Sequence, residues 1–463
     1  MSHHRSFGDI LAPGDAAHLI NLGLVYVPTP PNGSVHVHKR RLNRTSDEEN
    51  KHIPLNADIE TRPDAFATIP EKLISKATIE YVGFNSDKAR EIWSGWIAWP
   101  SGPIIREIDL GDETTLEVSF IDWVKGHTGN PLTDDVWKDD NSAWFHYIEQ
   151  RGIATELQYT IMDPLFRDMR LTGTCIGWLR DTIEMRYEGL RNIQRASAER
   201  ERALGHQGTS DQRPSGSASG GRHTLSGPSI IERFTVLYKA MDRARTDGLF
   251  DSKGALNRIS VLRSIPPTDF SENKTMYCFT PDYNLARKHA AWVKRRGPYA
   301  VIVKIAVQDS VIIAMDPPDI QCAFWLNSNW RELIWHCRTE TISKETVDYG
   351  RAALIIKTIA NGPNAYYHQR SPGELITEAC VVRVRGPNKG GDRAAVQYVF
   401  SFDYEGRKLL EDQANTIKIF SFDTCELEIW AKEIARFKYL RGLNAIARRA
   451  RKLLTLNLGP KYE

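Results

Sequence analysis

The side chains best suited to chemistry concentrate between residues 233 and 339. A predicted strand carries Lys239, and a second predicted strand carries Tyr277 and leads into a helix that begins near Thr280 and Tyr283. The stretch NWRELIWHC then places Glu332 at the entry of a further predicted strand. An amine, aromatic rings, a hydroxyl and a carboxylate on successive elements form a candidate site that could bind and act on a small molecule.

The common catalytic motifs are missing from the sequence. It contains no P-loop, no GxGxxG, no HExxH and no GxSxG pattern. Asp135 and Asp139 stand four residues apart, but acidic residues near a helix start are favoured by the helix dipole alone. We therefore predict no metal site.

The order of the elements between residues 233 and 339 resembles the ADP-ribosyltransferase fold. In that family a first-strand residue binds NAD, a second strand carries aromatic or hydroxyl residues around the nicotinamide, and a Glu on a later strand is catalytic. The resemblance implies that Glu332 is the catalytic carboxylate. It implies that NAD is bound by residues of the first two strands and the helix start, namely Lys239, Tyr277, Thr280 and Tyr283.

The chemistry of this family explains the residue types. Cleavage of the bond between ribose and nicotinamide develops positive charge on the ribose, which a carboxylate stabilises. Aromatic faces can sandwich the nicotinamide ring, and a basic donor can hold a ribose hydroxyl or the pyrophosphate. The resemblance thus implies NAD as substrate, a transferase or NAD glycohydrolase-like activity in complete or degenerate form, and a protein acceptor as partner.

Two positions depart from the family pattern. Lys239 stands where the family has Arg or His, and Trp330 stands where it usually has an acid that positions the acceptor. The candidate residues also fit structural roles, with Tyr277 in the core, Thr280 as a helix cap and Glu332 on the surface. The alternative function is therefore a non-enzymatic protein-protein interaction or scaffold protein.

Residues 230–428 are rich in strand patterns, which predicts a mixed α+β domain with a largely antiparallel sheet. A turn over residues 387–391 predicts that the last two strands form a hairpin. The predicted strands are 233–241, 275–280, 299–307, 310–315, 331–339, 378–386 and 394–402, with a helix over 280–296.

The rest of the chain divides by composition. Residues 1–70 are rich in proline and charge and predict a disordered N-terminal tail. Residues 75–204 predict a mainly helical domain with Trp93, Trp96 and Trp99 on one core-facing stripe and a long helix from Pro164. Residues 205–229, of which twelve are Gly or Ser, predict a flexible linker.

The charge is unevenly distributed along the 463 residues. The formal net charge is +3, yet residues 430–463 hold nine basic and two acidic side chains. Residues 429–463 therefore predict a basic amphipathic helix that could bind nucleic acid or another anionic surface. The oligomeric state is left open by the sequence.

Six scattered cysteines without a CxxC pair indicate free thiols in a reducing compartment. The sequence has no apolar run long enough for a transmembrane segment and no secretory signal. We therefore expect an intracellular protein, cytoplasmic or nuclear. The stretches VGFNSDKAREIW, LRSIPPTDF and GGDRAAVQYVF resemble an uncharacterised family of filamentous-fungal proteins.

Overall fold

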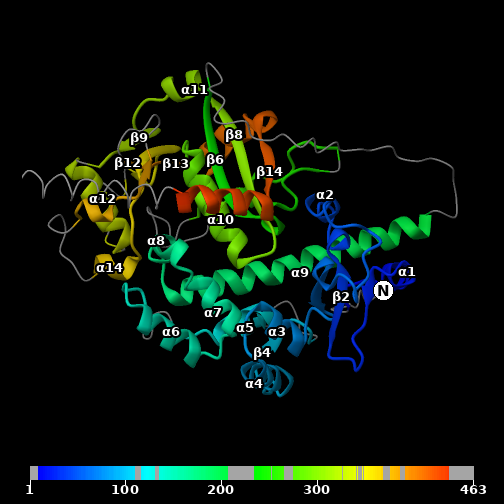
Figure 1. The fold of residues 1–463 in the computed structure, drawn as a ribbon. Helices are drawn as coiled ribbons and strands as arrows, with labels where there is room; N and C mark the ends of the chain where they lie inside the picture. Colours follow the sequence, from blue (N-terminus) through cyan, green and yellow to red (C-terminus); the bar gives the residue numbers. More distant parts are fainter. Residues whose placement is uncertain are drawn as a thin grey trace, which may run out of the picture.

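A computed structural model shows a mixed α+β protein built around one long helix, α9 (Cys175–His206) (Figure 1). In this view most of the elements that precede α9 lie below it, and two β-sheets from the C-terminal half lie above it. The structure describes residues 9–109, 116–130, 135–206, 234–251, 253–264, 275–325, 327–339, 341, 347, 349–368, 376–385 and 392–436.

The N-terminal region is folded, so the predicted disordered tail over residues 1–70 is wrong for its described part, residues 9–70. Three strands form an antiparallel sheet in the order β1 (Val25–Tyr26), β2 (Ser34–His38), β3 (Phe66–Pro70). Helix α1 (Pro13–Asn21) is held on α9 through the buried Asp15 carboxylate, which accepts hydrogen bonds from Ser197 and Arg200. These partners lie about 180 residues away in sequence, so local composition could not reveal them.

The region before α9 is mainly helical, as predicted. Its helices are α2 (Ser46–Glu49), α3 (Lys76–Val82), α4 (Ser86–Ile97), α5 (Phe120–Gly126), α6 (Asn141–Gln150), α7 (Thr155–Ile161) and α8 (Arg167–Arg170). A short parallel pair joins β4 (Ile104–Arg106) to β5 (Leu116–Val118). Instead of starting at Pro164, the long helix starts at Cys175, because a turn at Thr172 and Gly173 separates it from α8.

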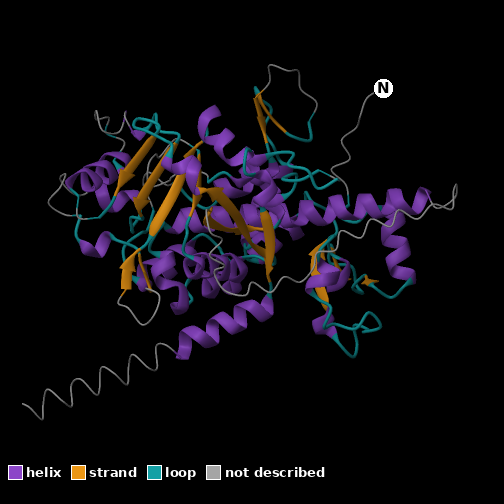
Figure 2. Ribbon diagram, turned by 90° about the horizontal axis from the view of Figure 1, so that it is seen from above, coloured by secondary structure: helices purple, strands orange, loops and turns teal. Residues whose placement is uncertain are grey.

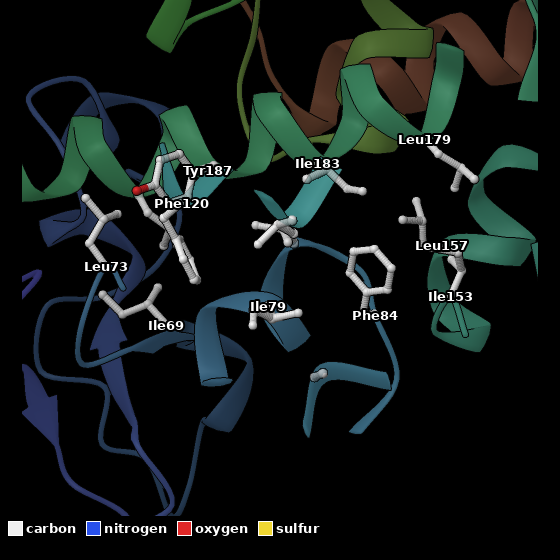
Figure 3. Close-up of a cluster of buried hydrophobic side chains, with 14 of the residues drawn as sticks. Ile69, Leu73, Ile79, Phe84, Phe120, Ile153, Leu157, Leu179, Ile183 and Tyr187 are labelled. Carbon is white, nitrogen blue, oxygen red and sulfur yellow. The ribbon is translucent and has the colours of Figure 1, made fainter. Parts of the chain in front are cut away.

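The apolar stripe of α9 closes the core of this half. Its buried residues include Leu179, Ile183 and Tyr187, which face Ile79 and Phe84 of the preceding helical segments (Figure 3). The tryptophan stripe also lies in this core: Trp96 is fully buried, and its two neighbours in the stripe pack against the same cluster. The predicted core role of these aromatics is confirmed.

The C-terminal half contains two principal sheets that lie next to one another with helices around them (Figure 2). One sheet has the order β14-β8-β6, and the other has the order β7-β13-β10-β9. All pairs are antiparallel except β10 with β9. The strands are β6 (Phe234–Asp242), β7 (Met276–Phe279), β8 (Ala300–Gln308), β9 (Ile320–Ala323), β10 (Leu354–Thr358), β13 (Val396–Ser401) and β14 (Lys418–Phe422).

Four predicted strands are confirmed as β6, β7, β8 and β13, and the helix predicted over 280–296 is α10 (Tyr283–Arg296). Two predicted strands are wrong: residues 310–315 mostly lie in α11 (Asp309–Ile313), and residues 331–339 mostly lie in α12 (Ser328–Arg338). The predicted final hairpin is confirmed in part, because short strands on either side of the predicted turn pair antiparallel. The short strand β11 (Arg383–Arg385) pairs with β12 (Asp392–Ala394), whereas β13 pairs with β10 and β7.

Further short helices, α14 (Asn364–His368) and α15 (Tyr404–Glu411), lie beside the sheets, and residues 424–436 form a helix after β14. In that last helix Trp430 is buried and stacks on Phe166, with ring centroids 5.4 Å apart. The predicted tail helix is thus confirmed over residues 429–436. Residues 437–463 of the tail and 207–229 of the predicted linker lie outside the described residues.

The two halves are packed together along a seam. Phe166 and Met169, from the segment before α9, share a buried cluster with Trp292 and Trp430 of the C-terminal half. Tyr299, at the start of β8, belongs to the core cluster of the N-terminal half. Within the described residues, no helix combines the length and apolar character that a bilayer crossing requires.

Candidate functional site

Lys239 lies where the two sheets of the C-terminal half meet. It lies on β6, which pairs with β8 along one edge. The neighbouring residue Tyr238 forms a β-bridge with Thr280, just after β7. Both backbone hydrogen bonds of that bridge form, at 2.8 and 2.9 Å. The Lys239 ammonium is thereby brought beside β7, where it donates to the Ser264 hydroxyl and to the Cys278 carbonyl oxygen at 3.4 Å.

The charge of Lys239 is poorly compensated. No carboxylate pairs with it in the described part of the chain, and its closest aromatic contact is the face of Phe279, 5.8 Å from the ammonium. Burial lowers the pKa of Lys239, and the positive charge of Arg245 lowers it further. A half-buried amine with neutral acceptors and no carboxylate partner can hold an anion or, once deprotonated, act as a base.

The two residues around the start of α10 are close to Lys239 but have structural partners. The Thr280 hydroxyl donates to the Val396 carbonyl at 3.0 Å and accepts from the Asp282 backbone N–H at 3.1 Å. Asp282, rather than Thr280, caps α10 through the Leu285 backbone N–H. The Tyr283 ring packs on Tyr238, with centroids 5.2 Å apart, and burial raises the pKa of Tyr283.

Tyr277 is a core residue. It is fully buried, and its ring stacks on Phe402 with centroids 5.4 Å apart. Its hydroxyl has no hydrogen-bond partner among the described residues, and burial raises its pKa to about 12. A ring enclosed in this way supports the β7 sheet and is not open to a ligand.

Glu332 lies on a helix and not at the entry of a strand. Trp330, Leu333 and Ile334 of α12 are fully buried, which is the spacing of a helical face, and the Asn327 side chain caps the helix through the Asn329 N–H. Glu332 lies between these positions and is exposed. The strand prediction is therefore wrong, because the apolar positions of this segment recur every three to four residues and not every two.

Four of the five candidate residues come from adjoining elements, and the fifth does not. Lys239, Tyr277, Thr280 and Tyr283 belong to β6, β7 and the start of α10, which contact one another. Glu332 lies on α12, whose buried face belongs to a core cluster with residues of β7, β9 and β10, and within the described residues it makes no hydrogen bond or ion pair with the other four. The sheet junction is thus a candidate binding site without its predicted carboxylate.

A second charged centre, which the sequence pattern did not indicate, lies at the seam between the halves. The Arg296 guanidinium lies between Trp178 and Trp292, 4.8 Å from each ring, and donates to Asp181 at 2.5 Å. Arg245 donates to the same carboxylate at 2.9 Å. Burial opposes the charge of Asp181, but the two arginines together lower its pKa to about 2.

Asp242, at the end of β6, completes this centre. Its side chain is 2% exposed and accepts the Ala244 backbone N–H at 2.8 Å. Burial raises its pKa to about 7, although nearby Arg245 acts in the opposite direction. The arrangement binds the halves together electrostatically, and its four side chains come from three separate segments of the chain, around residues 181, 242–245 and 296.

No protein-family model, curated protein or solved structure matches this chain. Among the described residues, no group of three or more His, Cys, Asp or Glu side chains is arranged to hold a metal ion. The function must therefore be argued from the geometry of the two centres.

Proposed function

We propose that the C-terminal half binds NAD at the junction of its two sheets and that Lys239 is the contact for an anionic or hydroxyl group of the dinucleotide. The observation that carries this proposal is the Lys239 ammonium, which burial desolvates and which has no carboxylate partner in the described part of the chain. A cation in such a place is stabilised by an incoming phosphate, because the anion supplies the missing counter-charge.

The surroundings of Lys239 support a ligand of this kind. The Ser264 hydroxyl and the Cys278 carbonyl fix the position of the ammonium, and the Phe279 ring covers one side of it. The order of strand, strand and helix is the part of the ADP-ribosyltransferase resemblance on which the proposal depends. NAD is therefore the ligand to test first.

The proposal is for a degenerate member of that family, which binds NAD and lacks efficient transfer. Glu332 is exposed on α12 and makes no hydrogen bond or ion pair with the junction residues in the described part of the chain. A carboxylate that stabilises a ribosyl cation must lie beside the ribose, since Coulomb stabilisation falls with distance and with exposure to water. The proposed protein acceptor has no support from the geometry.

The experiment compares the full-length protein with Lys239→Met in NAD binding by isothermal titration calorimetry. We expect the variant to bind NAD at least about tenfold more weakly, because one charge-assisted contact is lost. Lys304→Met is the matched control: Lys304 lies on the adjacent strand β8, and burial lowers its pKa as well. Equal NAD affinity in all three proteins, or no binding to the wild type, contradicts the proposal.

Nicotinamide release, followed by chromatography, tests the chemical step. We expect release that is no faster than the uncatalysed reaction, and no difference between the wild type and Glu332→Gln. Rapid release that Glu332→Gln abolishes would show that Glu332 reaches the ribose and that the protein is an active enzyme.

The alternative, a protein-protein interaction role, is favoured by one surface of the N-terminal half. Ile97, Ile104 and Leu116 are 57%, 41% and 64% exposed, and the last two are paired residues of the isolated β4–β5 ribbon. A two-stranded ribbon with an apolar face is a common site for pairing with a second copy. Sedimentation analysis of Leu116→Glu against the wild type tests this: an unchanged, monomeric mass in both excludes it.

A further inference from the structure

A cavity of about 380 Å³ lies at the seam between the two halves. The N-terminal half contributes Tyr81 from α3, Glu156 from α7 and Arg186 from α9. The C-terminal half contributes Arg295 and Arg296 from the end of α10, followed by the turn at Gly297 and Pro298. Arg186, Arg295 and the Glu156 carboxylate therefore line a pocket formed by both halves. Arg296 also borders it, but its guanidinium is held between two tryptophan rings.

Arg186 is the residue that joins the two walls of the cavity. Its Nε donates to the Arg296 carbonyl at 3.0 Å, and its Nη2 donates to both carboxylate oxygens of Glu156, at 3.0 and 3.1 Å. The Arg186 side chain is 14% exposed, whereas Glu156 is 63% exposed. The carboxylate opposite Arg186 is thus largely in water and neutralises it only in part.

Several donors that line the cavity have no acceptor within the described part of the chain. Arg295 uses its Nε for Asp163 at 3.1 Å, and its two Nη atoms make no hydrogen bond there. The Tyr81 hydroxyl likewise makes none, and the Arg296 Nε is buried without a partner. Several hydrogen-bond donors, most of them positively charged, favour an anionic acceptor with several oxygen atoms.

We propose that this seam cavity is an oxyanion site that takes a phosphate group. The phosphate oxygens would accept hydrogen bonds from the Tyr81 hydroxyl, from the Nη atoms of Arg295 and from the second N–H of Arg186 Nη1, whose first N–H donates to the Tyr81 carbonyl at 3.4 Å. A bound phosphate contacts both halves at once, so it stabilises their docking. The site is separate from the sheet junction, and it does not depend on NAD binding.

The test measures thermal unfolding of the full-length protein in inorganic phosphate and in chloride at equal ionic strength and pH. We expect phosphate to raise the melting temperature in a saturable way, because it binds the folded state alone. Malonate at the same ionic strength distinguishes a carboxylate site from a phosphate site. A shift with malonate as large as that with phosphate would refute the assignment to phosphate.

Two variants locate the effect. Arg295→Gln and Tyr81→Phe should each weaken phosphate binding, the first by about tenfold or more. Arg287→Gln is the matched control, since Arg287 lies on the same helix and pairs with Glu433 outside the cavity. If Arg295→Gln fails to fold, Tyr81→Phe still tests the proposal, because it removes only the hydroxyl and keeps the packing of the ring.

A third variant should act in the opposite direction. Glu156→Gln removes the carboxylate that competes for Arg186, so phosphate should bind several times more tightly. Lys239→Met, which affects the proposed NAD site, should leave the phosphate effect unchanged. Phosphate affinities that are equal in the wild type, Arg295→Gln and Tyr81→Phe, or a shift no larger than that of chloride, would overturn the proposal.

Discussion

Two cations of the C-terminal half are removed from water in opposite ways. At the seam, Arg296 is 3% exposed, lies between two tryptophan rings and has the Asp181 carboxylate at 2.5 Å. At the sheet junction, Lys239 has a hydroxyl, a carbonyl and one aromatic face, and no carboxylate within the described residues. Both positions are conformationally fixed by sheets and helices that meet there.

The difference indicates that Arg296 stabilises the fold and that Lys239 belongs to a candidate binding site. A buried cation with a matched anion holds the fold together, and its loss leaves the partner uncompensated. A buried cation without one is a cost to folding, and such costs are typical of positions that bind or react. The comparison predicts that neutralising the two cations should change stability with opposite sign.

The largest expected effect is at the seam. Arg296→Met should destabilise the protein by about 3 kcal/mol, because Asp181 keeps only Arg245 as a partner and the tryptophan sandwich loses its charge. Urea unfolding at pH 7 measures this. A loss below about 1 kcal/mol would show that the seam does not depend on this ion pair.

The next effect is a pH dependence that originates from Asp242. Its folded-state pKa is about 7, whereas the ordinary value is 3.8, so the folded protein holds a proton that the unfolded chain releases. Stability should therefore fall as the pH rises from about 4 to about 7 and remain low above it. Asp242→Asn, which keeps an acceptor for the Ala244 N–H, should be more stable than the wild type at pH 8 by about 2 kcal/mol.

Thermal or urea unfolding of both proteins between pH 4 and pH 8 checks this prediction. Arg245 and Asp181 face Asp242 and titrate outside this range in the folded state, so the difference between the two proteins isolates Asp242. Parallel stability curves for the wild type and Asp242→Asn would contradict the assignment.

A smaller effect of opposite sign is expected at the junction. Lys239→Met should leave stability unchanged or raise it by about 1 kcal/mol, because an uncompensated charge is replaced by an apolar chain of similar length. Urea unfolding measures the change, with Lys304→Met on β8 as the control. A destabilisation comparable to that of Arg296→Met would mean that Lys239 is a structural residue.

The smallest effect is expected for Glu332→Gln. The side chain is exposed on α12, so the free energy of unfolding should change by less than about 0.5 kcal/mol, and NAD affinity should stay the same. Urea unfolding and calorimetry check both quantities. A loss of NAD affinity would show that Glu332 contributes to the proposed NAD site.

Local sequence patterns predicted the elements whose periodicity is strong. The apolar runs of β6 and β8 and the three-to-four-residue stripe of α9 appear in the structure as expected. The same reasoning failed at α12, where WRELIWHC has enough apolar residues for either type of element. Strand β10 was missed although it is central to its sheet.

The candidate site was predictable only as a set of residue types. Sequence order correctly brought Lys239, Thr280 and Tyr283 to neighbouring elements, since β6, β7 and α10 are close in the chain and in space. It could not show that the Tyr277 ring is enclosed by Phe402, because that contact joins strands of different parts of the chain. The partners of Arg296 were equally hidden, since Asp181 lies 115 residues away.

The sequence by itself determined the mixed α+β class, the positions of the long helix and the principal strands, and the types of side chain available for chemistry. Tertiary structure decided which charges are compensated: Asp181 reaches Arg296 across the seam, and no carboxylate of the described residues reaches Lys239. The physical reason is that periodicity is a property of neighbouring residues, whereas the pairing of a buried charge depends on elements that meet only after the chain has folded.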